Sequence, residues 1–121
     1  MIICDTGPIF AAADRRDDDQ HACVELFAGL RLAGRRLPLL QTVMAEVGYM
    51  LEAKVGTFAE VAFLEAAADG SFELVDLTRA DVARVAELVA QYDDLPLGAT
   101  DVSVIALAER LGVACLGKRA R

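Results

Sequence analysis

Four short runs of apolar residues alternate along the chain with longer stretches in which apolar residues recur every three or four positions. Continuous apolar runs of this length are typical of strands that are covered on both faces of a parallel sheet. We therefore expect four strands, at Ile2–Asp5, Leu37–Leu40, Phe72–Val75 and Val113–Leu116.

The longer stretches predict helices between these strands. Pro8 suits the first turn of a short helix over residues 9–13, because a first-turn N–H needs no helical partner. We expect Thr42, Thr57 and Thr78 to be N-caps of later helices. The core-facing positions predicted for the longer helices are Cys23, Leu26, Phe27 and Leu30; Val43, Val47, Met50 and Leu51; Val61, Leu64 and Ala68; Val82, Val85, Leu88 and Val89; and Val104, Ile105, Leu107, Ala108 and Leu111.

This alternation predicts an α/β fold with a parallel sheet of about four strands and helices on both faces. The chain has 121 residues, which indicates a single domain over residues 1–121. Apolar residues make up 55% of it. A domain of about this size buries roughly two thirds of the surface that its unfolded chain exposes, so a substantial core is expected.

The net charge of −7 means that the surface as a whole repels nucleic acid and attracts a basic protein partner. A nucleic-acid substrate would need local basic patches or bound cations. The three cysteines have no CxxC spacing, so we expect neither a cysteine zinc site nor a disulfide framework. No signal peptide and no apolar run of about 18–20 residues is visible, so we expect a cytoplasmic protein with no membrane association.

Three acidic residues are placed by the predicted topology at one edge of the sheet. Asp5 ends the first strand, Glu46 lies about one turn into the helix after the second strand, and Asp101 lies in the first turn of the last helix. In right-handed crossovers each helix starts at the carboxyl edge of the sheet, where open α/β sheets bind ligands. The three carboxylates are therefore expected to converge.

Three converging carboxylates repel one another unless a cation neutralises them, and hard oxygen donors suit Mg²⁺ or Mn²⁺. Such a site can activate water for phosphodiester hydrolysis. Thr6, beside Asp5, would support a ligating carboxylate through a hydrogen bond. Each acid taken singly has a simpler explanation. The helix dipole alone explains Asp101, and Glu46 could be a solvated residue on a helix face. The metal-site hypothesis rests on the three acids together.

Three segments carry a resemblance to a known family: residues 2–6, the helix with Glu46, and residues 95–112, which read LPLGATDVSVIALAERLG. Together they resemble PIN-domain ribonucleases, and most closely the VapC toxins of bacterial type II toxin–antitoxin systems. The resemblance covers about residues 1–113. It implies a three-layer sandwich fold and a Mg²⁺- or Mn²⁺-dependent endoribonuclease that cleaves RNA. Asp5, Glu46 and Asp101 would be its catalytic metal ligands, and it would form a homodimer that a small cognate antitoxin holds inactive.

The end of the chain departs from the family pattern, which has a further acid just after the fourth strand and a short fifth strand. The place of this acid falls to Gly117 or Ala120, and no Asp or Glu follows Glu109. Glu109 lies about 12 Å along the helix from Asp101, too far to substitute. We expect the fifth strand to be missing. Two alternatives to an active ribonuclease follow: a catalytically impaired PIN domain that still dimerises and binds antitoxin, and a metal-dependent phosphatase that acts on small phosphoesters.

Overall fold

The structure is a computed structural model that describes residues 2–14, 16, 18–95, 98–112 and 114–116. Its strands are β1 (Ile2–Cys4), β2 (Leu37–Leu40), β3 (Phe72–Val75) and β4 (Ala114–Leu116). Its helices are α1 (Thr6–Ala13), α2 (Gln20–Leu32), α3 (Gln41–Lys54), α4 (Thr57–Ala68), α5 (Arg79–Gln91) and α6 (Ala99–Leu111). The predicted elements are all present in the predicted order, although residue 113, the expected start of the fourth strand, lies outside the described residues.

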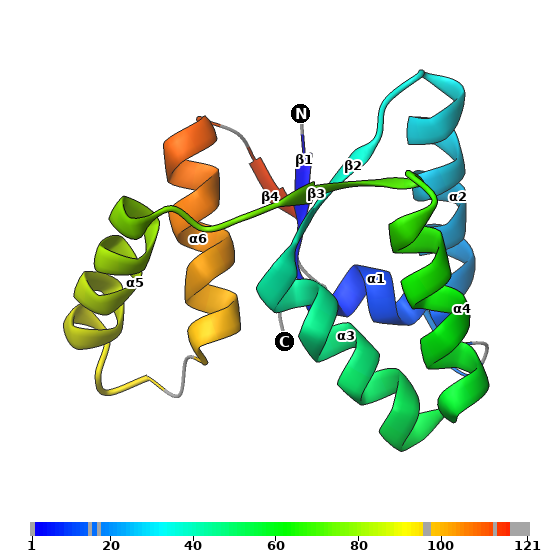
Figure 1. The fold of residues 1–121 in the computed structure, drawn as a ribbon, viewed down its shortest axis with the longest axis horizontal. Helices are drawn as coiled ribbons and strands as arrows, with labels where there is room; N and C mark the ends of the chain where they lie inside the picture. Colours follow the sequence, from blue (N-terminus) through cyan, green and yellow to red (C-terminus); the bar gives the residue numbers. More distant parts are fainter. Residues whose placement is uncertain (1, 15, 17, 96–97, 113, 117–121) are drawn as a thin grey trace.

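The helices lie on both sides of the strands (Figure 1). Helices α5 and α6 occupy one side, and α1, α2 and α4 occupy the other. Helix α3 contacts α1, α4 and α6, so it joins the two groups. None of the helices in the described ranges is both long and apolar enough to cross a membrane.

The strands pair in parallel, β1 with β4 and β2 with β3. Ile2 is opposite Ala114, and Leu37 is opposite Phe72. Strand β1 also lies against β2, which gives the spatial order β4-β1-β2-β3. The predicted α/β fold with parallel strands is confirmed. In the described part of the chain, however, the backbone ladders form two pairs and not one continuous sheet.

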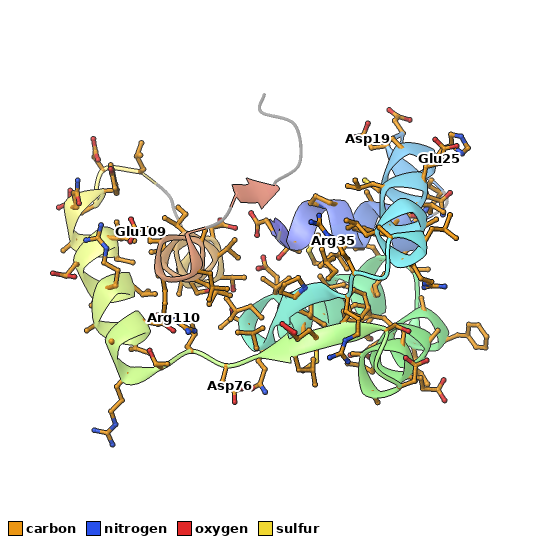
Figure 2. All side chains as sticks on the ribbon, turned by 90° about the horizontal axis from the view of Figure 1, so that it is seen from above. Asp19, Glu25, Arg35, Asp76, Glu109 and Arg110 are labelled. Atoms are coloured by element: carbon orange, nitrogen blue, oxygen red, sulfur yellow. The ribbon has the colours of Figure 1, made fainter. Side chains whose placement is uncertain are left out.

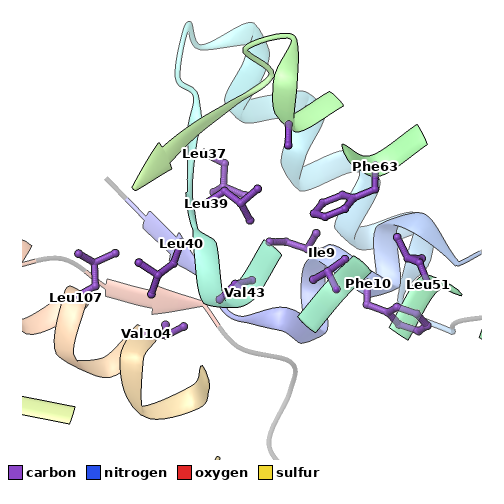
Figure 3. Close-up of a cluster of buried hydrophobic side chains, with 12 residues drawn as sticks. Ile9, Phe10, Leu37, Leu39, Leu40, Val43, Leu51, Phe63, Val104 and Leu107 are labelled. Carbon is purple, nitrogen blue, oxygen red and sulfur yellow. The ribbon is translucent and has the colours of Figure 1, made fainter. Parts of the chain in front are cut away.

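The main core lies where β2 meets α1, α3, α4 and α6 (Figure 3). All four residues of β2 are buried, as expected for a strand covered on both faces. This packing fixes the starts of α1, α3 and α6 around the end of β2. The buried members of the cluster are Ile9, Phe10, Leu37, Leu39, Leu40, Val43, Val47, Leu51, Phe63, Ala67, Val104 and Leu107.

Helix α1 begins earlier than predicted, at Thr6 rather than at Ile9. The cause is local: the Asp5 side chain accepts a hydrogen bond from the Thr6 backbone N–H at 2.7 Å and so caps the helix. Pro8 lies in the first turn, as predicted. The expected extension of the first strand to Asp5 is wrong by one residue, because Asp5 belongs to the cap.

Two of the three predicted N-caps are wrong. Strand β2 runs directly into α3, so Leu40 is the N-cap and Thr42 already lies in the first turn. Gly56 is the N-cap of α4 in place of Thr57, with a φ of +131° that a residue with a side chain rarely adopts. Thr78 is an N-cap as predicted, in a reciprocal capping box with the side chain of a residue three positions later.

The predicted core-facing positions hold for α3 and fail in part for the other helices. Helix α2 has no buried residue, and of its predicted positions Phe27 and Leu30 are partly buried against the core.

In α4, Val61 and Leu64 are exposed while Phe63 and Ala67 are buried. This helix is alanine-rich and apolar on every side, so its sequence does not define which face is buried. Its most exposed large side chain is Phe58, at 89%.

Helices α5 and α6 pack mainly on each other, and this pairing explains the remaining errors. Val82 and Val89 of α5 are exposed, as are Ile105 and Leu111 of α6. Helix α6 instead buries two sides, one against the main core and one against α5. The second contact is a small cluster of Leu88, Val102 and Ala106 with Val85 packed against it.

Two ion pairs also connect α5 with α6. Arg110 donates from Nε to the buried Asp81 carboxylate at 2.9 Å, and its Nη2 lies 3.5 Å from the carbonyl oxygen of Asp76. Figure 2 shows Arg110 directed toward the segment that carries Asp76. Glu109 accepts a hydrogen bond from Arg84 Nε at 2.9 Å. Glu109 is thus engaged with α5, in agreement with its exclusion from the predicted site.

Candidate active site

Asp5 stands between β1 and α1, at the carboxyl end of a strand that pairs on one side with β4. Its backbone is extended, with φ −74° and ψ 176°, and its carboxylate turns back to cap α1. The cap uses one oxygen, Oδ1, as the acceptor of the Thr6 N–H. The side chain is therefore fixed in direction at the edge of the strands where the sequence analysis placed it.

Glu46 reaches this edge from the second turn of α3. Its Oε2 accepts a hydrogen bond from the Thr6 hydroxyl at 3.1 Å. Thr6 is buried, with 6% of its surface exposed, so water has little access to compete for this bond. The contact brings together the two residues that the sequence analysis singled out as a metal ligand and its supporting hydroxyl.

Asp101 lies in the first turn of α6, near enough to Asp5 for its negative charge to act on the Asp5 carboxyl group. The pKa of Asp5 is raised above its ordinary value, mainly because burial disfavours the charged form. The Thr6 N–H opposes this shift, while the negative charges of Asp101 and Glu46 add to it. Asp101 and Glu46 therefore both lie close enough to Asp5 to act on its charge, in agreement with the predicted convergence.

The donor set fits a hard divalent cation in its chemistry, because all its groups are carboxylate or hydroxyl oxygens. The arrangement is not a closed ligand cage: within the described ranges, no group of three His, Cys, Asp or Glu side chains could hold a metal ion as it stands. The raised pKa of Asp5 comes first from burial and then from the charges of Asp101 and Glu46, and a cation would favour the charged carboxylate against both. Gly117 and Ala120, the places of the family's further acid, lie outside the described residues.

Two further hydroxyl residues connect the helices that carry Glu46 and Asp101. Thr42 Oγ1 and Ser103 Oγ are 2.8 Å apart and join the first turn of α3 to α6. Ser103 is 1% exposed. From the sequence, Thr42 was expected to cap the helix and Ser103 had no predicted role. A spacing signal existed for Thr42 alone, which precedes Glu46 by one helical turn.

An open groove of about 950 Å³ lies between α1, α2 and α4, on the other side of α1 from its cap. Its walls are mostly apolar, and Arg31, Arg35 and Arg36 together with Asp69 leave it with a net positive charge. No sequence pattern pointed to this groove, because it depends on the spacing of three helices. Its apolar lining includes Ile9, Ala12, Phe27, Leu30, Ala62 and Phe63.

Comparisons with known proteins agree with this architecture. The PIN domain model matches residues 2–119. The chain is 30% identical over 109 residues to ribonuclease VapC26 of Mycobacterium tuberculosis, a match that covers 90% of this chain and 78% of that protein. The crystal structure of the sarcin-ricin-loop-cleaving toxin VapC20 of the same organism matches with a TM-score of 0.81 at 17% sequence identity, covering 94% of this chain and 87% of that one. At this identity the structural match speaks for the fold alone.

Proposed function

The chain belongs to the PIN-domain family, in its VapC-type branch, and from this premise we propose that it is a toxin that cleaves RNA with the help of a bound Mg²⁺ or Mn²⁺ ion. The observation that carries the proposal is the convergence of three acids from three separate elements. Thr6 donates its N–H to Asp5 and its hydroxyl to Glu46, and the negative charges of Asp101 and Glu46 both raise the pKa of Asp5. The ribonuclease name of the similar VapC26 supports the choice of RNA as substrate.

The three acids would hold the ion between them, with Asp5 already within electrostatic reach of Asp101 and Glu46. When bound, such an ion offsets charge on the phosphodiester and lowers the pKa of a bound water. The Thr6 hydroxyl orients the Glu46 carboxylate, and the Thr6 N–H fixes that of Asp5. Without a cation the acidic edge repels the RNA backbone, so the same residues make the activity metal-dependent.

The groove between α1, α2 and α4 supports the proposed antitoxin partner. Its apolar walls suit a partner segment, and its three arginines suit acidic residues on that segment. Helix α1 links the groove to the site, because Asp5 caps the start of the same helix that lines the groove. Its eight residues span about 12 Å, so a short extension of a bound segment would reach the acids. We assign this groove to the cognate antitoxin.

We also propose that the protein forms a homodimer, as its resemblance to VapC-type toxins implies. Two large apolar side chains outside the core support a protein contact of this kind. Phe58 of α4 is 89% exposed, and Tyr49 of α3 is 71% exposed. Exposed aromatic side chains are enriched where proteins associate.

The test is cleavage of a mixed RNA pool with Mn²⁺, with EDTA, and with the Asp5→Asn and Glu46→Gln proteins. Glu52→Gln is the matched control, because Glu52 is an exposed acid on the same helix as Glu46. We expect cleavage by the wild type and the control in Mn²⁺ alone. Cleavage that persists in EDTA or in Asp5→Asn would contradict the proposal.

The second candidate is a catalytically impaired PIN domain that binds antitoxin without cutting RNA. The observation that favours it is the absence of any Asp or Glu after Glu109 in the sequence. A folded wild-type protein that binds Mn²⁺ and leaves the RNA pool intact would decide for this candidate. Metal-dependent cleavage by the same protein would decide against it.

A further inference from the structure

Ser103 and Thr42 form a directed chain of hydrogen bonds. The Ser103 hydroxyl has one proton, and it donates this proton to the carbonyl oxygen of Thr100 at 2.6 Å. Its oxygen must then be the acceptor in the 2.8 Å contact with Thr42, so Thr42 Oγ1 is the donor. The chain runs from α3 through Ser103 to the first turn of α6, and it ends at the residue directly before Asp101.

This chain connects the two helix starts that carry acids. Thr42 is one helical turn before Glu46 on α3, so the two side chains lie on the same face. On α6, Thr100 and Ser103 flank Asp101 in the sequence. The chain therefore ties together the two helix starts that carry Glu46 and Asp101.

Burial makes the chain hard to replace. Ser103 is 1% exposed and lies between the valines Val102 and Val104, which are equally buried. Ser103 is therefore shielded from water that could take the place of a removed hydroxyl group. Both partners are neutral, so the link between α3 and α6 does not change with the charge of the acids.

We propose that Thr42 and Ser103 are positioning residues that hold the start of α3, which carries Glu46, against the start of α6, which carries Asp101, and so support the binding of a divalent cation by these acids. The inference rests on the proposed function, since it concerns the same candidate site. It differs from the support given by Thr6, which touches Glu46 directly. Thr42 and Ser103 act on the acids only through the relative placement of α3 and α6.

The test measures Mn²⁺ binding by calorimetry and unfolding by thermal melts in EDTA for four variants: Ser103→Ala, Thr42→Val, Thr42→Ser and the double variant Thr42→Val with Ser103→Ala. We expect about tenfold weaker Mn²⁺ binding for Ser103→Ala and for Thr42→Val, the usual order for residues that orient metal ligands. Thr42→Ser keeps the donor and should bind as the wild type does. The double variant should bind Mn²⁺ no more weakly than the single variant with the lower affinity, because either single change already breaks the hydrogen-bond chain.

Thr57→Val is the matched control, since Thr57 is an exposed threonine in the first turn of α4. Wild-type Mn²⁺ affinity in both Ser103→Ala and Thr42→Val would overturn the inference, whether or not their melting temperatures fall. Additive losses in the double variant would also overturn it. Failure of the proposed function has a separate signature, in which Asp5→Asn binds Mn²⁺ as tightly as the wild type does.

Discussion

The hydroxyl of Thr6 donates a hydrogen bond of 3.1 Å to the Glu46 carboxylate and so joins the first turn of α1 to α3. The same residue donates its backbone N–H to Asp5. One threonine thus contacts two of the three acids in the candidate site, through two different groups. The side-chain contact can be removed without the backbone one.

Thr6→Val tests that separation. The variant keeps the shape of the side chain and the N–H bond to Asp5, and it loses only the bond to Glu46. We expect about tenfold weaker Mn²⁺ binding in calorimetry, since Glu46 loses the group that orients it. Thr6→Ser should restore the wild-type affinity. Equal affinities in Thr6→Val and the wild type would show that Glu46 needs no orienting group.

Asp5→Asn should stabilise the metal-free protein at neutral pH. Because the pKa of Asp5 is raised in the folded state, the folded protein holds this proton more tightly than the unfolded chain does. The free energy of unfolding therefore falls as the pH rises from the ordinary value of 3.8 through the raised pKa. Asparagine carries no such charge, so the variant avoids this loss.

Thermal melts in EDTA from acid to neutral pH provide the measurement. The melting temperatures of Asp5→Asn and the wild type should converge in acid and separate toward neutral pH, with the variant higher. Asp93→Asn, a change at an exposed loop acid, is the control and should show no such separation. A variant that melts lower than the wild type at neutral pH would contradict the raised pKa.

Arg110→Met should destabilise the fold through Asp81. Asp81 is 3% exposed. Its burial alone would raise its pKa, but hydrogen bonds from Thr78 and Arg110 outweigh burial and lower it. Removing the arginine leaves a buried carboxylate short of a partner, which costs about 1–3 kcal/mol in the free energy of unfolding. Urea denaturation at neutral pH measures the loss.

The pH dependence of this loss has a defined sign. Because the pKa of Asp81 is lowered, its contribution to stability is complete above the ordinary value of 3.8 and is lost as the pH falls below it. The difference between Arg110→Met and the wild type should therefore shrink in acid. Arg84→Met removes the exposed pair with Glu109 and should cost less. An equal cost for the two variants would rule out a special role for the buried carboxylate.

Gly117→Asp and Ala120→Asp test the departure at the end of the chain. Each supplies an acid at one of the two places where the family pattern has one, so one of the two variants should bind Mn²⁺ more tightly than the wild type. Faster RNA cleavage by the same variant would identify the missing acid as the limit on activity. Unchanged affinity in both would show that the three other acids form the whole ligand set.

Much of the fold could be predicted because it follows from short apolar runs and from the handedness of crossovers. The run at residues 37–40 predicted β2 to the residue, and the crossover rule brought Asp5 and Asp101 together across most of the chain. The helix starts were less predictable. A strand that runs straight into α3 leaves no loop for a cap, so the cap signal of Thr42 was misleading. The single domain and the homodimer stay predictions.

The supporting contacts of the site could not be predicted, because they depend on side-chain directions and on the distance between helices. Ser103 in the sequence is one small residue in an apolar helix, and only the packing of α6 against α3 makes it a partner of Thr42. The alanine-rich α4 shows the same limit for packing. Its composition allowed several buried faces, and the tertiary contacts of Phe63 selected one.

Asp81 has two roles at once, and through them the local unfolding of α5 is coupled to that of α6. Its side chain accepts the Thr78 N–H that starts α5 and also holds Arg110 in the last turn of α6. If the start of α5 frays, Arg110 of α6 loses its partner. If the end of α6 frays, the Asp81 carboxylate at the start of α5 is left as an unpaired buried charge. Amide hydrogens of α5 and of the end of α6 should therefore exchange with solvent in one shared opening event, as a single cooperative unit within the native state.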